Sequence, residues 1–567
     1  MSATTDIAGA PRGRSAISER VAGWINRLFA PIDIASIAVF RIGFGALLFL
    51  DLYEYFWRGW IKLYFIEPTY FFAYFGFDFI RPLPGVGMHA LFCVLLLCTI
   101  LITVGLFYRL AMATFFLGFS YVFLLDEARY LNHFYLVILI AFLMIFVPAA
   151  RGWSLDALIA RRRQDSMVPG WSLWILRAQV EIMLIYAGLV KLNADWLQGE
   201  PLGVWLAGAS ANLPIFGPLF LSDTVGLMSA WGAVLLHLIG APMLLFKSTR
   251  KYAFAAYCVF HVFNSFFFTI KIFPWLTIAA TLLFFDPDWP RQVWRNLTRW
   301  LPLRVTMAAE SATPARKSKR GRHAPANDDE KRTLFRVSLE FGKAALKPDR
   351  RKGKGSGHKS GSQPWNVPGP FGRAAIVTMV VAWTIFQIWI PARHLRYPGD
   401  TSWHEQGHTF AWQMMLRQKI ATAKFYVRDP DSERAWIVNP RRYLSKRQTY
   451  YMTTRPAPMR QFARYLEKVW AERHGTRDVE IRAFTAVALN GRRAQALVDP
   501  TRDLTEISYS FGNSDWILPL TEPMPPKAER WQQKPRKALL GYMKADPEVN
   551  FVLTELERSR NNKNNKK

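Results

Sequence analysis

The stretch EIMLIYAGLVKLNADW, residues 181–196, decides the fold class of this chain. Its first ten residues are apolar except for Glu181, which favours a helix that crosses a membrane. The helix ends at Lys191, and an Asn-Ala-Asp-Trp turn follows. A lysine at the end of a span is costly to remove from water unless it has a function. Two interpretations stay open: Lys191 is a reactive base, or it only anchors the helix at the interface, as most lysines at span ends do.

Apolar sequence is concentrated in the first half of the chain. Of 567 residues, 51% are hydrophobic, and long apolar runs fill the sequence up to residue 290. A span needs ~20 apolar residues. Candidate spans are 34–54, 88–107, 110–125, 134–149, 172–191, 227–246, 252–270, 272–287 and 374–391. We expect a polytopic α-helical membrane protein with about nine transmembrane helices. The polar residues 1–20 contain no apolar core, so no cleavable signal peptide is expected.

The distribution of basic residues predicts the orientation in the membrane. The net charge is +30, and Lys and Arg gather in alternate loops, such as Arg161–Arg163, and in segment 290–373. The positive-inside rule places these loops and the N-terminus in the cytoplasm, so an odd number of spans puts the C-terminal domain outside. Contact with anionic membrane lipid explains the positive charge better than nucleic-acid binding does, because the basic stretch lacks interleaved aromatic residues.

The spans divide the chain into six parts. We expect a cytoplasmic N-terminal segment (1–30), a transmembrane domain (31–290), a basic disordered cytoplasmic linker (291–372), a last transmembrane helix (373–392), an extracytoplasmic domain (393–545) and a disordered tail (546–567). In the outer domain KFYVRD, AWIVN and VEIRAFTAVALN predict strands, and PMRQFARYLEKVWAERHG predicts a helix ending at Gly475. This pattern indicates a C-terminal α+β extracytoplasmic domain. The three cysteines all lie in expected spans, so neither a disulfide in that domain nor a metal site is expected.

Two basic side chains are expected on the same side of the membrane. LLDEARYLNH, ending at His133, enters one span from outside, and KLNADW, starting at Lys191, leaves the next on that side. Burial would lower the pKa of both groups, and a desolvated lysine can act as a general base near neutral pH. A histidine whose polar atoms are simply satisfied is the alternative for His133.

Other polar residues lie inside expected spans. His261 and Asn264 are three residues apart and therefore share a helix face. Arg177 and Glu181 are one turn apart and could neutralise each other. So many polar groups imply a polar cavity, which suits a substrate site or a transport path. Interhelical hydrogen bonding is an equally good explanation for the His261–Asn264 pair.

Several stretches occur in an order that resembles one family. They are LLDEARYLNHFYL, LRAQVEIMLIYAGLVKLNADW and FHVFNS in the membrane part, and HLRYPGDTSWHEQGHTFAWQMM, IVNPRRYLSKR, ALVDP and DWILPL in the outer part. They resemble the vitamin K-dependent gamma-glutamyl carboxylase family, whose membrane part is also known as the HTTM domain. The resemblance covers nearly the whole chain except 300–370 and both ends.

This resemblance implies a mechanism. Lys191, in the context A-G-x-x-K-L-x-A-D-W, matches the lysine that deprotonates vitamin K hydroquinone. Oxygenation to the epoxide then generates a base that removes a γ-proton from a protein-bound glutamate, and the carbanion captures CO2. His133, next to Asn132, matches a histidine that stabilises the reacting intermediates. His261 and His394 match other functionally sensitive histidines.

The resemblance also implies the remaining site residues and partners. Cofactor binding is assigned to Asn132, His261 and Asn264, and substrate or structural support to His394, Trp412, Asp195, Trp196 and Arg177. The implied cofactors are vitamin K hydroquinone or a menaquinol-like quinone, O2 and CO2, with no metal. A glutamate-containing polypeptide outside the membrane is the implied partner. The composition and the uncleaved start suggest a bacterial member in the inner membrane, with a periplasmic C-terminal domain.

The sequence also departs from the family pattern. The family's animal members join the membrane and outer parts by a disulfide, whereas this chain has no cysteine outside its expected spans. Thr-Arg-Asp follows ALVDP, where the family tends to have an arginine directly after the proline. Gln413 stands after Trp412, where an acidic residue is usual. These departures fall mostly in the outer domain, so they bear on the polypeptide substrate more than on quinone oxidation. Two alternatives stay open: a quinone epoxidase or oxygenase without glutamate carboxylation, and a non-enzymatic transporter or lipid-binding membrane protein. Transport is disfavoured because no inverted repeat is visible.

Overall fold

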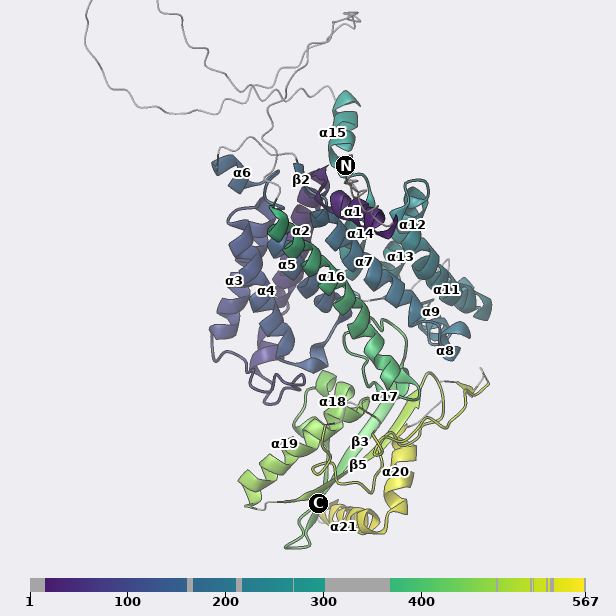
Figure 1. Ribbon diagram of the computed structural model, residues 1–567. Coiled ribbons are helices and arrows are strands. Elements are labelled where there is room, and N and C mark those ends of the chain that lie inside the picture. The colour runs from purple at the N-terminus through teal and green to yellow at the C-terminus, as the bar shows by residue number, and fades with distance from the viewer. Residues whose placement is uncertain are drawn as a thin grey trace, which may run out of the picture. The chain divides into compact units, whose positions relative to one another are not determined.

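The apolar part of the chain folds into helices that pack side by side (Figure 1). The computed structural model describes residues 16–160, 167–210, 217–268, 270–300, 368–475, 478–509, 512, 514–526, 529–530 and 535–564. The described parts of Met1–Pro287 and Pro364–Lys567 form one compact unit, so contacts between the helices and the outer domain belong to that unit. A second unit, Asp288–Gln363, contains α15 (Trp289–Trp300) and is described by itself.

The first unit begins with helices and one short strand pair. The α-helices before the outer domain are α1 (Ala16–Phe29), α2 (Ala35–Trp57), α3 (Gly87–Val104), α4 (Tyr108–Leu124), α5 (Asn132–Phe146), α6 (Leu155–Ile159), α7 (Trp171–Leu189), α8 (Ala194–Leu197), α9 (Leu202–Ser210), α10 (Gly217–Phe220), α11 (Asp223–Leu235), α12 (Ala241–Leu245), α13 (Arg250–Phe267), α14 (Phe273–Thr281) and α16 (Pro370–Ala392). Tighter or wider turns are η1 (Lys62–Ile66), η2 (Glu127–Arg129), η3 (Leu236–Gly240) and η4 (Leu282–Phe284). Strands β1 (Pro31–Asp33) and β2 (Met167–Pro169) pair antiparallel.

Helices occupy the positions of the expected spans. Within the described ranges, five are long and apolar enough to cross a membrane: Ala35–Trp57, Gly87–Val104, Trp171–Leu189, Asp223–Leu245 and Pro370–Arg396. Shorter apolar helices are Tyr108–Leu124, Asn132–Phe146 and Phe273–Phe284. The protein is therefore a mostly helical membrane protein with a small sheet, whereas the count of nine spans stays a prediction.

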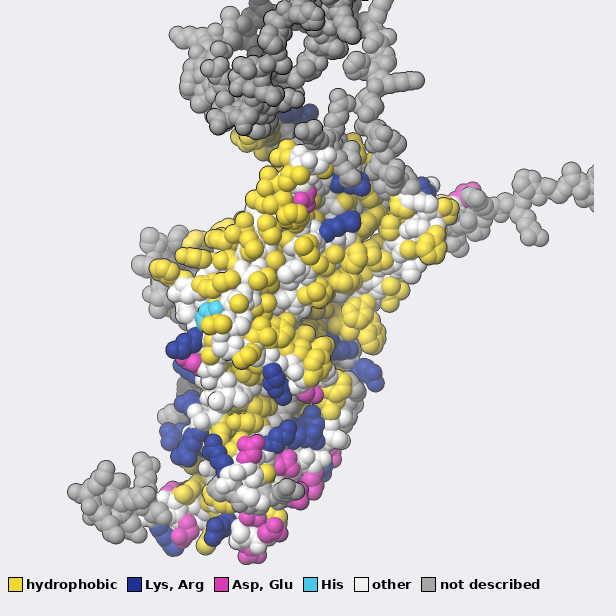
Figure 2. All heavy atoms as spheres, turned by 90° about the vertical axis from the view of Figure 1, so that its left-hand side faces the viewer, with side chains coloured by type: hydrophobic (Ala, Val, Ile, Leu, Met, Phe, Trp, Pro, Cys, Tyr) yellow, Lys and Arg dark blue, Asp and Glu magenta, His cyan; other side chains and the backbone are white. Residues whose placement is uncertain are grey.

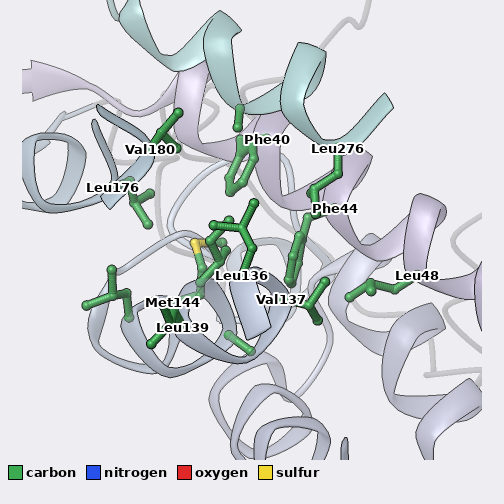
Figure 3. Close-up of a cluster of buried hydrophobic side chains, with 14 of the residues drawn as sticks. Phe40, Phe44, Leu48, Leu136, Val137, Leu139, Met144, Leu176, Val180 and Leu276 are labelled. Atoms are coloured by element: carbon green, nitrogen blue, oxygen red, sulfur yellow. The ribbon is translucent and has the colours of Figure 1, made fainter. Parts of the chain in front are cut away.

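Large apolar side chains join the central helices. Figure 3 shows side chains of α2, α5, α7 and α14 pointing toward one another, among them Phe40, Phe44, Leu48, Leu136, Val137, Leu139, Met144, Leu176, Val180 and Leu276. Because lipid tails are as apolar as these side chains, close van der Waals packing holds the helices together in the membrane. This cluster fixes the helices that carry the polar residues discussed below.

The outer domain is built on a three-stranded antiparallel sheet with the strand order β4-β3-β5. Its elements are η5 (Arg393–Arg396), α17 (Thr401–His404), β3 (Lys419–Arg428), β4 (Ala435–Val438), η6 (Pro440–Arg442), α18 (Lys446–Thr453), α19 (Pro456–His474), β5 (Glu480–Leu489), α20 (Pro535–Ala545) and α21 (Pro547–Asn564). The three predicted strands and the predicted helix are present. Helix α19 ends at Gly475, whose φ of 70° suits a residue without a Cβ.

Two predicted disordered segments differ from the structure. The tail 546–567 is helical over α21, because Val549 is buried against the same cluster as Leu539 and Met543 of α20. The linker 291–372 begins inside α15 and ends inside α16, and its residues 301–367 lie outside the described part of the chain.

The surface separates apolar from charged side chains. Figure 2 shows a face with a broad hydrophobic area above and mixed Lys, Arg, Asp and Glu below. Exposed residues on the helices include Leu50, Trp57, Leu110, Leu117, Ile385 and Trp389. A contiguous apolar surface of this kind suits contact with lipid.

Candidate active site

Lys191 lies two residues beyond the end of α7, where the chain turns back into α8. Its side chain is only 5% exposed. The Nζ atom donates a hydrogen bond to the Ala187 carbonyl at 2.7 Å and lies 5.1 Å from the centre of the Trp196 ring. Burial lowers the pKa of Lys191 to about 7, and among the described residues no carboxylate pairs with it. Much of this lysine is therefore an uncharged amine at neutral pH, which is the state a general base requires.

Two predicted histidines lie on either side of one phenylalanine. The ring of Phe273 is 6.1 Å from the ring of His133 and 5.9 Å from that of His261. Both histidines are buried, and His133 Nε2 and the two ring nitrogens of His261 have no hydrogen-bond partner among the described residues. The structure thus brings together two of the residues that the sequence singled out and leaves part of their hydrogen-bonding capacity unused.

A third buried histidine, His237, was missed from the sequence. It lies in the π-turn η3, and Lys191 and His261 are close enough to interact with it electrostatically. Its ring packs 5.9 Å from Tyr257 and 5.3 Å from Phe260. The available signal was a single histidine in the otherwise apolar run VLLHLIGA (residues 234–241), which a membrane span rarely carries without a reason.

The loop after Lys191 is attached to the outer domain by a buried ion pair. Arg492 donates two hydrogen bonds to the Asp195 carboxylate, at 2.6 and 2.7 Å, and Asn490 donates a third at 2.8 Å. Asp195 is 6% exposed and Arg492 8%. The Asn193 side chain caps α8 by accepting from Trp196 N, which holds Trp196 beneath the lysine. We call the Asp195–Arg492–Asn490 group the inter-domain clamp.

A second contact joins α5 to the outer domain. Asn132 donates to the Gln413 carbonyl at 3.4 Å and accepts from the Tyr130 hydroxyl at 2.9 Å. Trp412 is fully buried, and its ring lies 4.9 Å from that of Tyr135. The sequence predicted roles for Asn132 and Trp412 without indicating that they meet at the same contact.

Comparison with known proteins accounts for both halves of the chain. Residues 29–289 match the HTTM domain, and residues 372–523 match the vitamin K-dependent gamma-carboxylase lumenal domain. The chain belongs to the vitamin K-dependent gamma-carboxylase family. No solved structure matches it. The protein is therefore a gamma-carboxylase-like membrane protein, and its family uses vitamin K hydroquinone, O2 and CO2.

The remaining predicted residues have contacts of their own, and one predicted pair is absent. The expected Arg177–Glu181 pair is wrong: Arg177 donates instead to the carbonyls of 283, 284 and 285, where the chain turns after α14. Glu181 has no hydrogen-bond partner among the described residues. His394 lies in η5, where its Nδ1 is 2.6 Å from the Pro391 carbonyl. Asn264 is partly buried on α13, one turn beyond His261.

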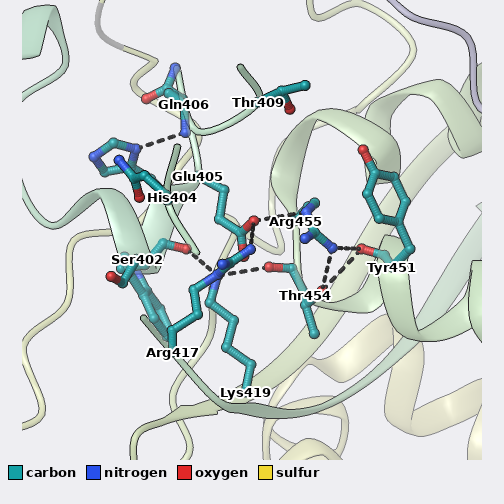
Figure 4. A network of polar contacts seen from close by, with 12 residues as sticks. Ser402, His404, Glu405, Gln406, Thr409, Arg417, Lys419, Tyr451, Thr454 and Arg455 are labelled. Atoms are coloured by element: carbon teal, nitrogen blue, oxygen red, sulfur yellow. Dashed lines mark hydrogen bonds and ion pairs between the residues drawn. The ribbon is translucent and has the colours of Figure 1, made fainter. Parts of the chain in front are cut away.

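The carboxylase-family outer domain also contains a buried charged network (Figure 4). Glu405 accepts hydrogen bonds from Arg417 Nε at 2.7 Å and Lys419 Nζ at 2.9 Å, and it forms an ion pair with Arg455 Nε at 2.7 Å. Burial opposes ionisation of Glu405, but the three cations prevail and hold its pKa well below the ordinary value. Burial lowers the pKa of Lys419 to about 8 despite this carboxylate. The network ties the segment after α17 to β3 and α18.

The residues around Lys191 fit a flat aromatic ligand that carries hydroxyl groups. Each basic side chain has an aromatic ring against it: Trp196 against Lys191, Phe273 against His133 and His261, and Phe260 against His237 and His261. The nitrogens of His133 and His261 that lack partners could bond to such hydroxyls. Among the described residues no group of three or more His, Cys, Asp or Glu side chains could hold a metal ion.

Proposed function

We propose that this chain is an integral membrane enzyme that couples oxygenation of reduced vitamin K, from hydroquinone to epoxide, to γ-carboxylation of glutamate in a polypeptide. One observation carries the proposal: among the described residues Lys191 is a buried amine without an acidic partner, held over the Trp196 ring and close enough to His237 to interact with it. An anchoring lysine would extend to the interface, where it remains charged and hydrated. Burial with a pKa near 7 is the property of a base.

Lys191 acts by removing a proton from a phenolic hydroxyl. Its bond to Ala187 and its position over Trp196 hold the amine in place. Once protonated, the ammonium is stabilised by the Ala187 carbonyl and the Trp196 ring, and its charge stabilises the new substrate oxyanion. His133 and His261 supply hydrogen bonds in a site that excludes water.

Bound hydroquinone supplies, on oxygenation, a base stronger than any side chain, which the weakly acidic γ-CH of glutamate requires. The protein must then present the glutamate close to Lys191. The inter-domain clamp supports this assignment, because it attaches the turn after β5 of the outer domain directly to the loop that follows the lysine.

The test is an assay in detergent-solubilised membranes with reduced vitamin K, labelled bicarbonate and a glutamate peptide. The wild-type protein is expected to form both epoxide and labelled peptide. The Lys191→Ala variant is expected to form neither product. Lys62→Ala is the matched control, because Lys62 has a side chain 71% exposed and should retain both activities. Epoxide without label would refute the carboxylation half, and epoxide formation unchanged in Lys191→Ala would refute the role of the lysine.

We further propose that the inner membrane of a bacterium holds this protein, with the N-terminus cytoplasmic and the outer domain periplasmic. The match to a lumenal domain and the basic loops support this orientation. In a background without the native cysteines, a membrane-impermeant maleimide should label Glu433→Cys in intact spheroplasts. It should label Thr298→Cys on α15 only after permeabilisation. The reverse pattern would overturn the orientation.

A further inference from the structure

A π-turn interrupts the helix that runs from Asp223 to Leu245 and contains its only histidine. The turn, η3, covers Leu236–Gly240 and includes His237, whose side chain is 4% exposed. A π-turn inserts one extra residue into a helix, shifts the side chains that follow, and is frequent at functional sites.

One nitrogen of His237 is engaged and the other is not. Nδ1 lies 2.7 Å from the Ala233 carbonyl. Because a carbonyl oxygen only accepts, Nδ1 must carry the hydrogen, and in a neutral ring Nε2 is then an acceptor. The hydrogen bonds of the described residues include none to Nε2, and Nε2 does not count among their fully buried atoms without a partner, so it keeps some exposure. The ring therefore presents one fixed, unused acceptor although the residue is almost completely buried.

The position of His237 is set by close contact with α7. A Cβ added to Gly188 would lie 2.9 Å from His237 Cβ and 2.8 Å from Leu238 Cδ2. Glycine is therefore needed at 188 for the two helices to approach this closely. Lys191 N bonds to the Gly188 carbonyl at 3.0 Å, so His237 packs one helical turn from the lysine.

The surroundings of His237 suit an aromatic ligand. Tyr257 and Phe260 pack on both His237 and His261, with ring distances between 5.2 and 6.0 Å. The charged or titratable groups that face His237 are Lys191, His261 and Tyr257, and none of them is a carboxylate. Nothing described here would hold His237 in the charged form, so it acts as a neutral acceptor.

We propose that His237 is a further ligand-binding residue of the Lys191 site, whose Nε2 accepts a hydrogen bond from a phenolic hydroxyl of the aromatic substrate. The inference rests on the proposed function for the identity of that substrate. The hydroxyl that His237 binds is one that Lys191 does not deprotonate, so the two residues together select a ring with two hydroxyl groups over its oxidised quinone, which has no hydrogen to donate.

The activity test compares two substitutions. His237→Phe keeps an aromatic ring but removes the acceptor, and His237→Gln can place an amide oxygen near the same position. One neutral hydrogen bond corresponds to about a 2- to 13-fold change in affinity. We therefore expect His237→Phe to raise KM for reduced vitamin K by about 3- to 10-fold with little change in kcat, and His237→Gln to restore it. An unchanged KM, or an equal loss in both variants, would overturn the proposal.

A binding test separates this inference from the proposed function. The probes are 1-naphthol and 1-methoxynaphthalene, which differ in the hydroxyl hydrogen, and binding is followed by quenching of tryptophan fluorescence. Wild type and the control His89→Phe, whose histidine is exposed on α3, should prefer the naphthol by several-fold, and His237→Phe should lose that preference. If the wild type forms no epoxide but prefers the naphthol, and His237→Phe loses that preference, only the proposed function is refuted. Equal preference in wild type and His237→Phe would refute the role of His237 whatever the activity.

Discussion

Replacing Arg492 with alanine tests whether the inter-domain clamp holds the two parts together. The change removes two charge-assisted hydrogen bonds from Asp195, which are worth about 1.5–3 kcal/mol each. It also leaves Asp195, which is 6% exposed in the intact protein, with Asn490 as its remaining side-chain partner. Breaking a buried pair in this way typically costs about 3–5 kcal/mol. We expect a loss of free energy of unfolding in that range.

The assay is urea unfolding in detergent followed by tryptophan fluorescence, run as a double-mutant cycle. Asp195→Ala should lower the free energy of unfolding by a similar amount. The double variant should lose less than the sum of the two single losses, because it leaves no buried charge without a partner. The coupling energy should reach at least about 1.5 kcal/mol. Arg493→Ala is the neighbouring control, since the Arg493 side chain is 71% exposed and 3.9 Å from its partner Glu529. Additive losses, or a loss in Arg493→Ala equal to that in Arg492→Ala, would refute the reasoning.

Further predictions concern titration and packing. Because burial lowers the pKa of Lys191 to about 7, the rate of epoxide formation should rise with pH through that value as the amine loses its proton, and Lys191→Ala should lack this rise. The pKa of Glu405 is lowered on folding, so its contribution to stability is present above its ordinary value of 4.5 and is lost as pH falls; chemical denaturation should show acid destabilisation that is weaker in Glu405→Gln. Gly188→Ala forces a methyl group against Leu238 and His237, and thermal unfolding should report a loss of about 1–3 kcal/mol.

The sequence predicted those parts of the molecule that depend on local pattern. Helix positions followed from runs of apolar residues, and the sheet followed from alternation in β3 and β5. Lys191 was predicted as a candidate site residue because it stands directly after an apolar run. The predicted disorder was wrong for Pro547–Asn564, because α21 gains its stability from packing on α20, which local composition does not reveal.

The parts that sequence could not predict depend on contacts between distant segments. Arg177 was expected to pair with Glu181 because they are one helical turn apart, yet the carbonyls at the end of η4 offered three acceptors instead. His237 stands out as a single histidine in an apolar run, but its contact with α7 could not be predicted, because a π-turn leaves no mark in a hydrophobic pattern. The clamp joins residues 297 positions apart, a separation at which periodicity carries no information.

That separation has a consequence for the order in which the molecule is assembled. Asp195 leaves the ribosome 297 residues before Arg492. At synthesis rates of about 5–20 residues per second, its partner arrives about 15–60 s later. During that interval the helix bundle must already be inserted, while the loop beside Lys191 is still hydrated and its carboxylate is paired only with water. The loop beside Lys191 is therefore fixed to the outer domain late, when the chain is nearly complete, and a nascent protein arrested before residue 492 should lack this attachment.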